Sequence, residues 1–127
     1  MKREELAKPV LRIALALVFL YFGFSQVINP DAWVGFVPEN LVPANLTANN
    51  LVMANAILEL CLGIFMIIGL YTRFSSIILA IHLIGIASSL GFTPLGVRDF
   101  GLCVATLVVY LNGADALTVD AWFKRKV

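Results

Sequence analysis

The sequence predicts an all-α integral membrane protein, built as a four-helix bundle in a single domain over residues 1–127. Composition is the first observation behind this prediction. Hydrophobic residues make up 61% of the chain and charged residues only 13%, whereas ordinary soluble domains carry roughly 25% charged residues. The second observation is that four apolar stretches approach the roughly 20 residues that a helix needs to cross a bilayer. A soluble chain of this length could not enclose so much apolar surface.

The predicted spans are joined by two short links and one longer loop. Pro9 suits the first turn of the first helix. The loop over residues 29–49 carries three prolines together with Trp33 and Phe36, so we expect it at the membrane interface, where aromatic rings are favoured. Only residues 71–73 separate the second and third spans, which predicts an antiparallel hairpin. The spans are placed at about 10–28, 50–70, 74–91 and 98–112.

Basic residues are distributed unevenly along this pattern. Eight of the nine Lys and Arg residues lie near the chain ends or in the 71–73 turn, and only Arg98 lies on the opposite side of the bilayer. Because basic residues concentrate in cytoplasmic segments, we predict a multi-pass protein of the cell membrane with both termini in the cytoplasm and the 29–49 loop outside. The eight residues are Lys2, Arg3, Lys8, Arg12, Arg73, Lys124, Arg125 and Lys126.

Each predicted span gathers polar and small residues at a spacing of three or four, which places them on one helix face. Surfaces that face lipid should be uniformly apolar, so these faces predict a polar interior around Glu59. A carboxylate at this depth is costly, which makes a functional role the default. The alternative is a structural role, with Glu59 protonated or paired with His82 or Arg12. The faces comprise Arg12, Ala16, Phe19, Gly23 and Gln26; Asn55, Glu59, Gly63 and Met66; Ser75, Ile78, His82, Gly85 and Ser89; and Asp99, Cys103, Thr106 and Tyr110.

Glu59 and His82 are the candidate catalytic residues, because a carboxylate and an imidazole near mid-membrane can exchange protons. Arg12 lies so near the membrane surface that snorkelling to the interface is the simpler explanation for it. Asp99 is equally consistent with a role at a helix N-terminus. The candidate substrate-binding residues are Arg12, Gln26, Asn55, Arg98 and Asp99.

Other chemistries find little support. Cys61 and Cys103 are expected at a similar depth, but cysteine is also a common buried apolar residue, and a dry, inaccessible pair does not favour redox chemistry. The single histidine and the two isolated cysteines do not have the spacing of a metal or haem site. No metal or haem is therefore expected, and nothing in the sequence indicates nucleic-acid binding.

Four stretches of the chain read LRIALALVFLYFGFSQV, AWVGFVPENL, ILELCLGIFMIIGLYTR and LVVYLNGADALTVDAW. In these stretches the chain resembles the DoxX-like family of small four-helix integral membrane proteins. Asp99 stands where relatives often carry an acidic residue, and NGADALTVD replaces the glycine-proline-glycine that relatives often have at the last turn. The resemblance implies that the family positions in this chain are Arg12, Glu59, Gly63, Gly69, Arg73 and Asp120.

The resemblance also implies an association with redox chemistry, because the namesakes of the family are associated with thiosulfate:quinone oxidoreduction. The leading hypothesis is a membrane subunit in which a quinone or a small sulfur oxyanion reaches the bundle from the outer half or laterally. Glu59 would carry protons with His82 as a relay, and Arg12 and Arg98 would contact an anion. A soluble or membrane redox partner would supply electrons. The rings expected to line the headgroup pocket are Phe19, Phe22 and Phe65.

Two other hypotheses remain open, and whether the chain is itself an enzyme is left open with them. The chain can instead be a non-enzymatic scaffold or assembly subunit, in which the polar faces only hold helices together. It can also be a small proton-coupled transporter or channel subunit, which a bundle of this size would form as a homo-oligomer. Replacing Glu59 with Gln separates these hypotheses, because only quinone chemistry and transport require its proton.

Overall fold

The structure is a computed structural model that describes residues 1–127, and it contains helices and connecting segments but no strand. Four helices are long and apolar enough to cross a membrane, and this confirms the predicted all-α four-helix architecture. The long helices are α1 (Arg3–Ile28), α2 (Ala48–Ile68), α3 (Thr72–Leu90) and α4 (Pro94–Asn112). The shorter ones are η1 (Pro30–Ala32), η2 (Val34–Phe36), η3 (Glu39–Leu41) and α5 (Val119–Lys126).

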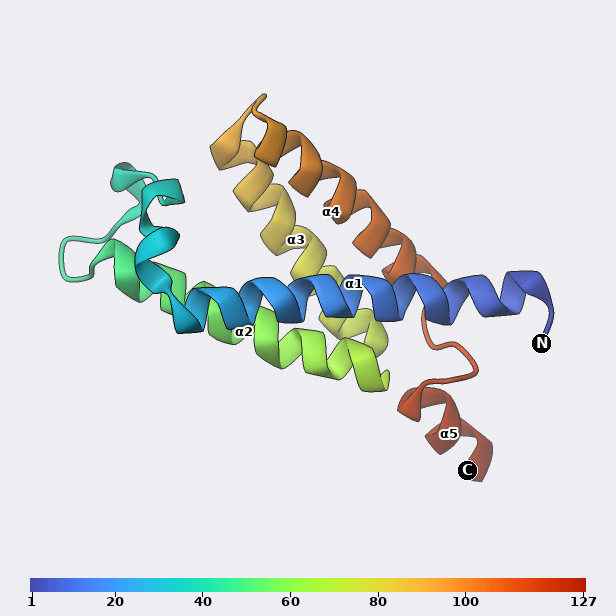
Figure 1. The fold of residues 1–127 in the computed structure, drawn as a ribbon. Helices are drawn as coiled ribbons and strands as arrows, with labels where there is room; N and C mark the ends of the chain where they lie inside the picture. The colour runs from blue at the N-terminus through green and yellow to red at the C-terminus, as the bar shows by residue number, and fades with distance from the viewer.

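The long helices form two antiparallel pairs. Helix α1 lies along α2, and α3 lies along α4, and the two pairs cross at an angle (Figure 1). The pairs meet where the α2–α3 turn and the segment after α4 lie, and we call this the terminal end. They diverge toward the opposite end, which carries η1–η3 and the α3–α4 link, and we call this the loop end.

Helix starts depend on local capping more than on hydropathy. Helix α4 begins at Pro94, one turn before the predicted span, because the Thr93 side chain accepts a hydrogen bond from the Gly96 backbone N–H at 3.1 Å and proline suits the first helical position. Helix α1 begins at Arg3, so the prediction that Pro9 lies in its first turn is wrong. The preceding residues are strong helix formers, and they extend the helix past the missing N–H of Pro9.

The apolar core lies between the two helix pairs, away from the loop end. Small residues allow close approach there, as transmembrane packing requires. At Gly63, for example, an added Cβ would lie 3.1 Å from Leu20 Cδ2 of the neighbouring helix. The buried core residues come from all four long helices and are Leu15, Ala16, Phe19, Leu62, Met66, Leu79, Leu83 and Val109.

Asp120 fastens α5 to the α2–α3 turn. Its carboxylate accepts hydrogen bonds from the backbone N–H groups of Tyr71 and Thr72, both at 2.8 Å. It also accepts one from the Thr72 hydroxyl at 2.8 Å, while its own backbone N–H donates to the Gly69 carbonyl. Burial by itself raises the pKa of Asp120, but these hydrogen bonds from Thr72 and Tyr71 and the charge of Lys124 outweigh it and hold that pKa below 3.8.

We predict that this carboxylate makes the stability of the protein depend on pH. A carboxylate with a lowered folded-state pKa stabilises the fold above its unfolded pKa of about 3.9, and this stability is lost as the pH falls through the folded value. Asp120→Asn should therefore unfold more easily at neutral pH, by about 1 kcal/mol as for a lost helix cap. The difference from the native chain should shrink as the pH falls below about 4.

Thermal unfolding in mild detergent between neutral and acidic pH measures this difference. Asp31→Asn is the matched control, because Asp31 is exposed and its side chain makes no hydrogen bond or ion pair. A difference between Asp120→Asn and the native chain that stays constant down to acidic pH would contradict the prediction.

Candidate functional site

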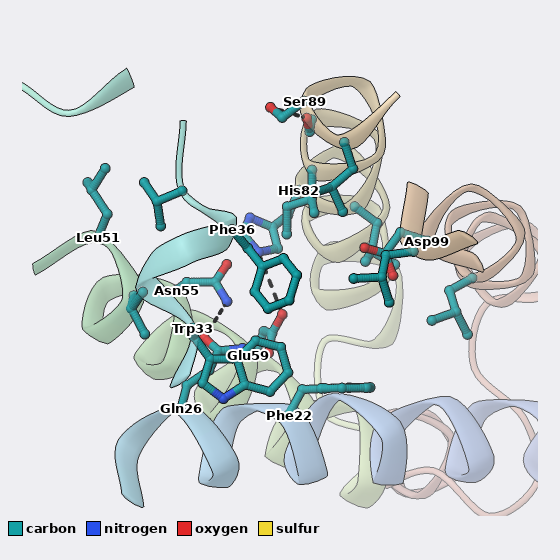
Figure 2. A pocket seen from close by; sticks show the side chains of 18 of the residues that line it. Phe22, Gln26, Trp33, Phe36, Leu51, Asn55, Glu59, His82, Ser89 and Asp99 are labelled. Carbon is teal, nitrogen blue, oxygen red and sulfur yellow. Dashed lines mark hydrogen bonds and ion pairs between the residues drawn. The ribbon is translucent and has the colours of Figure 1, made fainter. Parts of the chain in front are cut away.

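The divergence of the helix pairs leaves a cavity of about 510 Å³ at the loop end. All four long helices and the loop after α1 contribute to its walls (Figure 2). Hydrophobic side chains supply 15 of its 24 lining residues, and its volume falls in the range of ligand pockets, which are concave and mostly apolar. The lining residues with polar side chains include Gln26, Asn55, Glu59, His82, Ser89, Arg98 and Asp99.

Glu59 lies at the inner end of this cavity, on α2, with only 5% of its surface exposed. Its Oε2 accepts a hydrogen bond from Gln26 Nε2 at 3.3 Å. Gln26 Oε1 in turn accepts one from Asn55 Nδ2 at 2.6 Å. This chain of amides runs from α2 to α1 and back to α2, and it orients one carboxylate oxygen while the other faces the cavity.

His82 faces that second oxygen from α3. Its Nε2 lies 3.8 Å from Glu59 Oε1, and Figure 2 shows the two side chains pointing toward each other. This distance is too long for a hydrogen bond, and the buried Nε2 atom has no other partner. Because buried polar atoms in folded proteins are nearly always hydrogen-bonded, the unpartnered Nε2 atom leaves one hydrogen-bonding position of the imidazole unfilled by the protein.

Arg98 and Asp99 form a second polar cluster at the α4 wall. Arg98 contacts Asp99 Oδ1 through Nη2 at 2.9 Å and through Nε at 3.0 Å. The guanidinium also lies over the Phe22 ring of α1, with its Cζ 4.9 Å from the ring centroid, which is a cation–π arrangement. Asp99 is 5% exposed, so the positive charge of Arg98 is committed to a buried carboxylate and an aromatic face.

Aromatic rings cover the loop side of the cavity. Trp33 packs edge-on against Phe22, with ring centroids 5.6 Å apart, and its other neighbour Phe36 lies at 5.8 Å. The Trp33 indole N–H donates to the Ser25 hydroxyl at 3.3 Å, which ties the loop to α1. Of the three rings predicted to line a headgroup pocket, Phe19 and Phe22 line this cavity, whereas Phe65 packs beside the core.

The structure brings together six of the seven predicted site residues and separates the seventh. Arg12 lies at the terminal end, outside the cavity, and is 1% exposed. Its Nε contacts Asp115 Oδ2 at 2.7 Å, and its Nη1 donates to the carbonyls of Met66 and Ile67. The interpretation of Arg12 as a snorkelling side chain is therefore wrong, because the residue is enclosed and paired.

Asp115 was missed by the sequence reasoning. It lies 103 residues from Arg12 in the chain, in the segment that departs from the family pattern at the last turn. A signal was present, since an isolated carboxylate directly after an apolar span needs a partner, and Arg12 is predicted on the same side of the membrane.

The remaining family positions lie mostly at the terminal end. Arg73 packs over Gly113, where an added Cβ would lie 2.7 Å from Arg73 Nε. Gly69 ends α2 with a φ of 73°, and its carbonyl receives the Asp120 N–H described above. Only Glu59 among the family positions lines the cavity. Arg12, Gly69 and Asp120 therefore make structural contacts at the terminal end, and Arg73 packs against Gly113.

The two cysteines do not join. Cys61 is exposed and Cys103 is partly buried, and both are free thiols. Cys103 Sγ lies 3.2 Å from the Ala80 carbonyl, which accepts its hydrogen bond. That contact ties α4 to α3. Neither cysteine lines the cavity.

Comparison with known proteins gives one family match. The family model described as DoxX matches residues 7–93, which is more than half of the chain. No curated protein and no solved structure matches it. The matched segment contains Gln26, Asn55, Glu59 and His82 and ends before Asp99. Together with the four apolar helices, the match makes the chain a multi-pass membrane protein in a lipid bilayer.

We predict that the Arg12–Asp115 pair is essential for stability. Arg12→Met should lower the free energy of unfolding by about 3 to 5 kcal/mol, because it leaves the Asp115 carboxylate buried without a partner. The double variant Arg12→Met/Asp115→Leu removes both charges and should regain most of that loss. Denaturation in mild detergent measures these two variants and the single variant Asp115→Leu, and a double variant whose loss equals the sum of the two single losses would refute the coupling.

Proposed function

The chain belongs to the DoxX family, and we propose that it is a membrane subunit that binds a quinone in the loop-end cavity and exchanges protons with it there. One observation carries this proposal. The Glu59 carboxylate and the unpartnered His82 imidazole face each other across 3.8 Å at the inner end of a mostly apolar cavity.

The lining residues fit a quinone ring. Such a ring is flat and apolar on its faces and carries carbonyl oxygens that accept hydrogen bonds. The rings of Phe22, Trp33 and Phe36 offer an aromatic wall on one side of the cavity. In the tautomer with the proton on Nε2, His82 offers an N–H donor that has no hydrogen-bond acceptor in the protein.

The charge balance of the cavity favours a neutral substrate. Two buried carboxylates, Glu59 and Asp99, line it, and the one guanidinium there, from Arg98, is already paired with Asp99. An anion would therefore find no free Lys or Arg side chain in the lining to pair with, and an unpaired charge is costly to bury. A small sulfur oxyanion is therefore dropped from the proposal, and a neutral quinone is kept.

Glu59 and His82 would supply the protons. Complete reduction of a quinone consumes two electrons and two protons, and the proposal assigns the electrons to a soluble or membrane redox partner. A buried carboxylate next to an imidazole can pass a proton from one to the other and on to a bound carbonyl oxygen. The hydrogen bond from Gln26 to Glu59 keeps one carboxylate oxygen oriented during this exchange.

We propose that the protein has the membrane orientation predicted from its sequence, with both termini on the cytoplasmic side. Eight of the nine Lys and Arg residues belong to the terminal end, and Arg98 alone belongs to the loop end, a distribution that supports cytoplasmic termini in a protein of the cell membrane. The cavity would then lie in the outer half of the bilayer.

We predict that the protein retains quinone when it is purified in mild detergent, and that the cavity residues control this retention. His82→Leu should weaken quinone binding by about tenfold, because a net hydrogen bond is lost. Glu59→Gln keeps the shape of the side chain but cannot exchange a proton, so it should abolish quinone turnover with the partner while the protein stays folded. Mass spectrometry of extracted quinone and a binding titration measure the first effect.

Glu39→Gln is the matched control, because Glu39 is exposed in the loop and does not line the cavity. A native chain that binds no quinone, but instead co-purifies with one stoichiometric soluble partner, would favour the scaffold hypothesis. Proton-coupled flux through a homo-oligomer that Glu59→Gln abolishes, without any bound quinone, would favour the transporter.

A further inference from the structure

The cavity is closed on three of its sides. Toward the terminal end it meets the core, where Phe19 and Leu83 belong both to the cavity lining and to the core cluster. On the side between α1 and α4, the contact of Arg98 with the Phe22 ring bridges the two helices. On the loop side, the aromatic ring of Trp33 and the residues that follow it in the loop form a cover.

The side between α2 and α3 has no comparable closure. These helices are consecutive and joined by a tight turn at the terminal end, and they diverge toward the loop end (Figure 1). The Glu59–His82 approach at 3.8 Å is the one polar contact between them. Beyond it, toward the loop end, no hydrogen bond or ion pair links α2 to α3.

The α3 rim of this gap is formed by Ile81, Gly85 and Ser89, which lie on one face of the helix in successive turns. All three line the cavity and are also exposed at the protein surface, and Ile81 is 63% exposed. A Cβ added at Gly85 would meet no atom within 4 Å. The cavity is therefore continuous with the protein surface along this face of α3. Gly85 has no side chain that would narrow the opening.

The rim is compatible with hydrocarbon. The Ser89 hydroxyl donates to the Gly85 carbonyl at 3.0 Å, so its polar atom is satisfied within the helix and does not require water. Ile81 of α3 and Leu51 of α2 add apolar surface to the cavity lining. An opening in a membrane-spanning helix pair can border lipid chains when its polar groups are satisfied within the protein.

We propose that this gap is a lateral portal, bordered by Gly85, through which the apolar tail of the bound molecule extends into the bilayer. The inference rests on the proposed quinone function and specifies its substrate class: a lipid-soluble quinone with a long hydrocarbon tail, taken from the membrane. The cavity of about 510 Å³ encloses the ring and the start of the tail. The rest of the tail stays among lipid chains, where its apolar surface remains out of water.

Gly85→Trp tests the portal, because it places a large ring at the rim from a position where an added Cβ meets no atom within 4 Å. Binding of two quinones with the same ring, one without a tail and one with a long alkyl tail, is titrated on the full chain in lipid nanodiscs. Gly85→Trp should weaken binding of the tailed quinone by roughly tenfold, about 1.4 kcal/mol, because the indole ring occupies the rim across which the tail has to pass. Binding of the tail-less quinone should stay within about twofold of the native value.

Gly101→Trp is the matched control. Gly101 lies exposed on α4, an added Cβ there also meets nothing within 4 Å, and the residue does not line the cavity. This variant should bind both quinones like the native chain. Gly85→Leu is the milder second variant, and it should weaken binding of the tailed quinone in the same direction by a smaller factor.

Three results would overturn the portal. Equal losses for both quinones would mean that position 85 borders the ring site. Unchanged binding of the tailed quinone in Gly85→Trp would mean that its tail leaves elsewhere. Both of these leave the quinone function standing, whereas a native chain that binds neither quinone removes the proposed function and the portal with it.

Discussion

The ion pair between Arg12 and Asp115 is the interaction on which the arrangement of the bundle depends. Both charges lie inside an apolar protein, so each must find its partner within the chain. The pair joins α1 to the segment after α4, and two further hydrogen bonds from Arg12 reach carbonyls at the end of α2. Asp120 adds the start of α3 to the same end. All four long helices are thereby fixed at the terminal end, and the two pairs are free to diverge at the other.

Each end of the bundle holds one buried side-chain atom without a hydrogen-bond partner, Ser75 Oγ near the start of α3 and His82 Nε2 at the loop end, but of the two residues only His82 lines the cavity. At the terminal end, Arg12 and Asp120 have partners for their donors and acceptors. At the loop end, Glu59 is held by Gln26 on one oxygen only, and His82 Nε2 has no partner although it is buried. An incompletely satisfied polar group is costly in a purely structural role. The same group becomes useful where a ligand completes the network, which is why the loop end carries the proposed chemistry.

The sequence predicted the parts of the structure that local periodicity determines. A chain in lipid must satisfy its backbone internally, so apolar stretches of sufficient length become helices. The spacing of Gln26, Asn55 and His82 placed them on faces that do meet around Glu59. Contacts between distant segments were not predictable in this way. The partner of Arg12 comes from an irregular turn, and the start of α1 was decided by good helix formers before Pro9 rather than by hydropathy.

The lipid bilayer around the protein explains how so small a helix bundle keeps a cavity open. In water, a gap between α2 and α3 would expose apolar walls, and the helix pairs would close over it to bury them. In a bilayer that force is absent, because lipid chains are as apolar as the side chains around the gap. Helix pairs locked at one end can therefore stay apart at the other, provided that a hydrocarbon chain fills the space. In the proposed arrangement the hydrocarbon tail of the quinone fills the gap between α2 and α3. The lipid bilayer then accounts both for the open side of the cavity and for a lipid-soluble substrate.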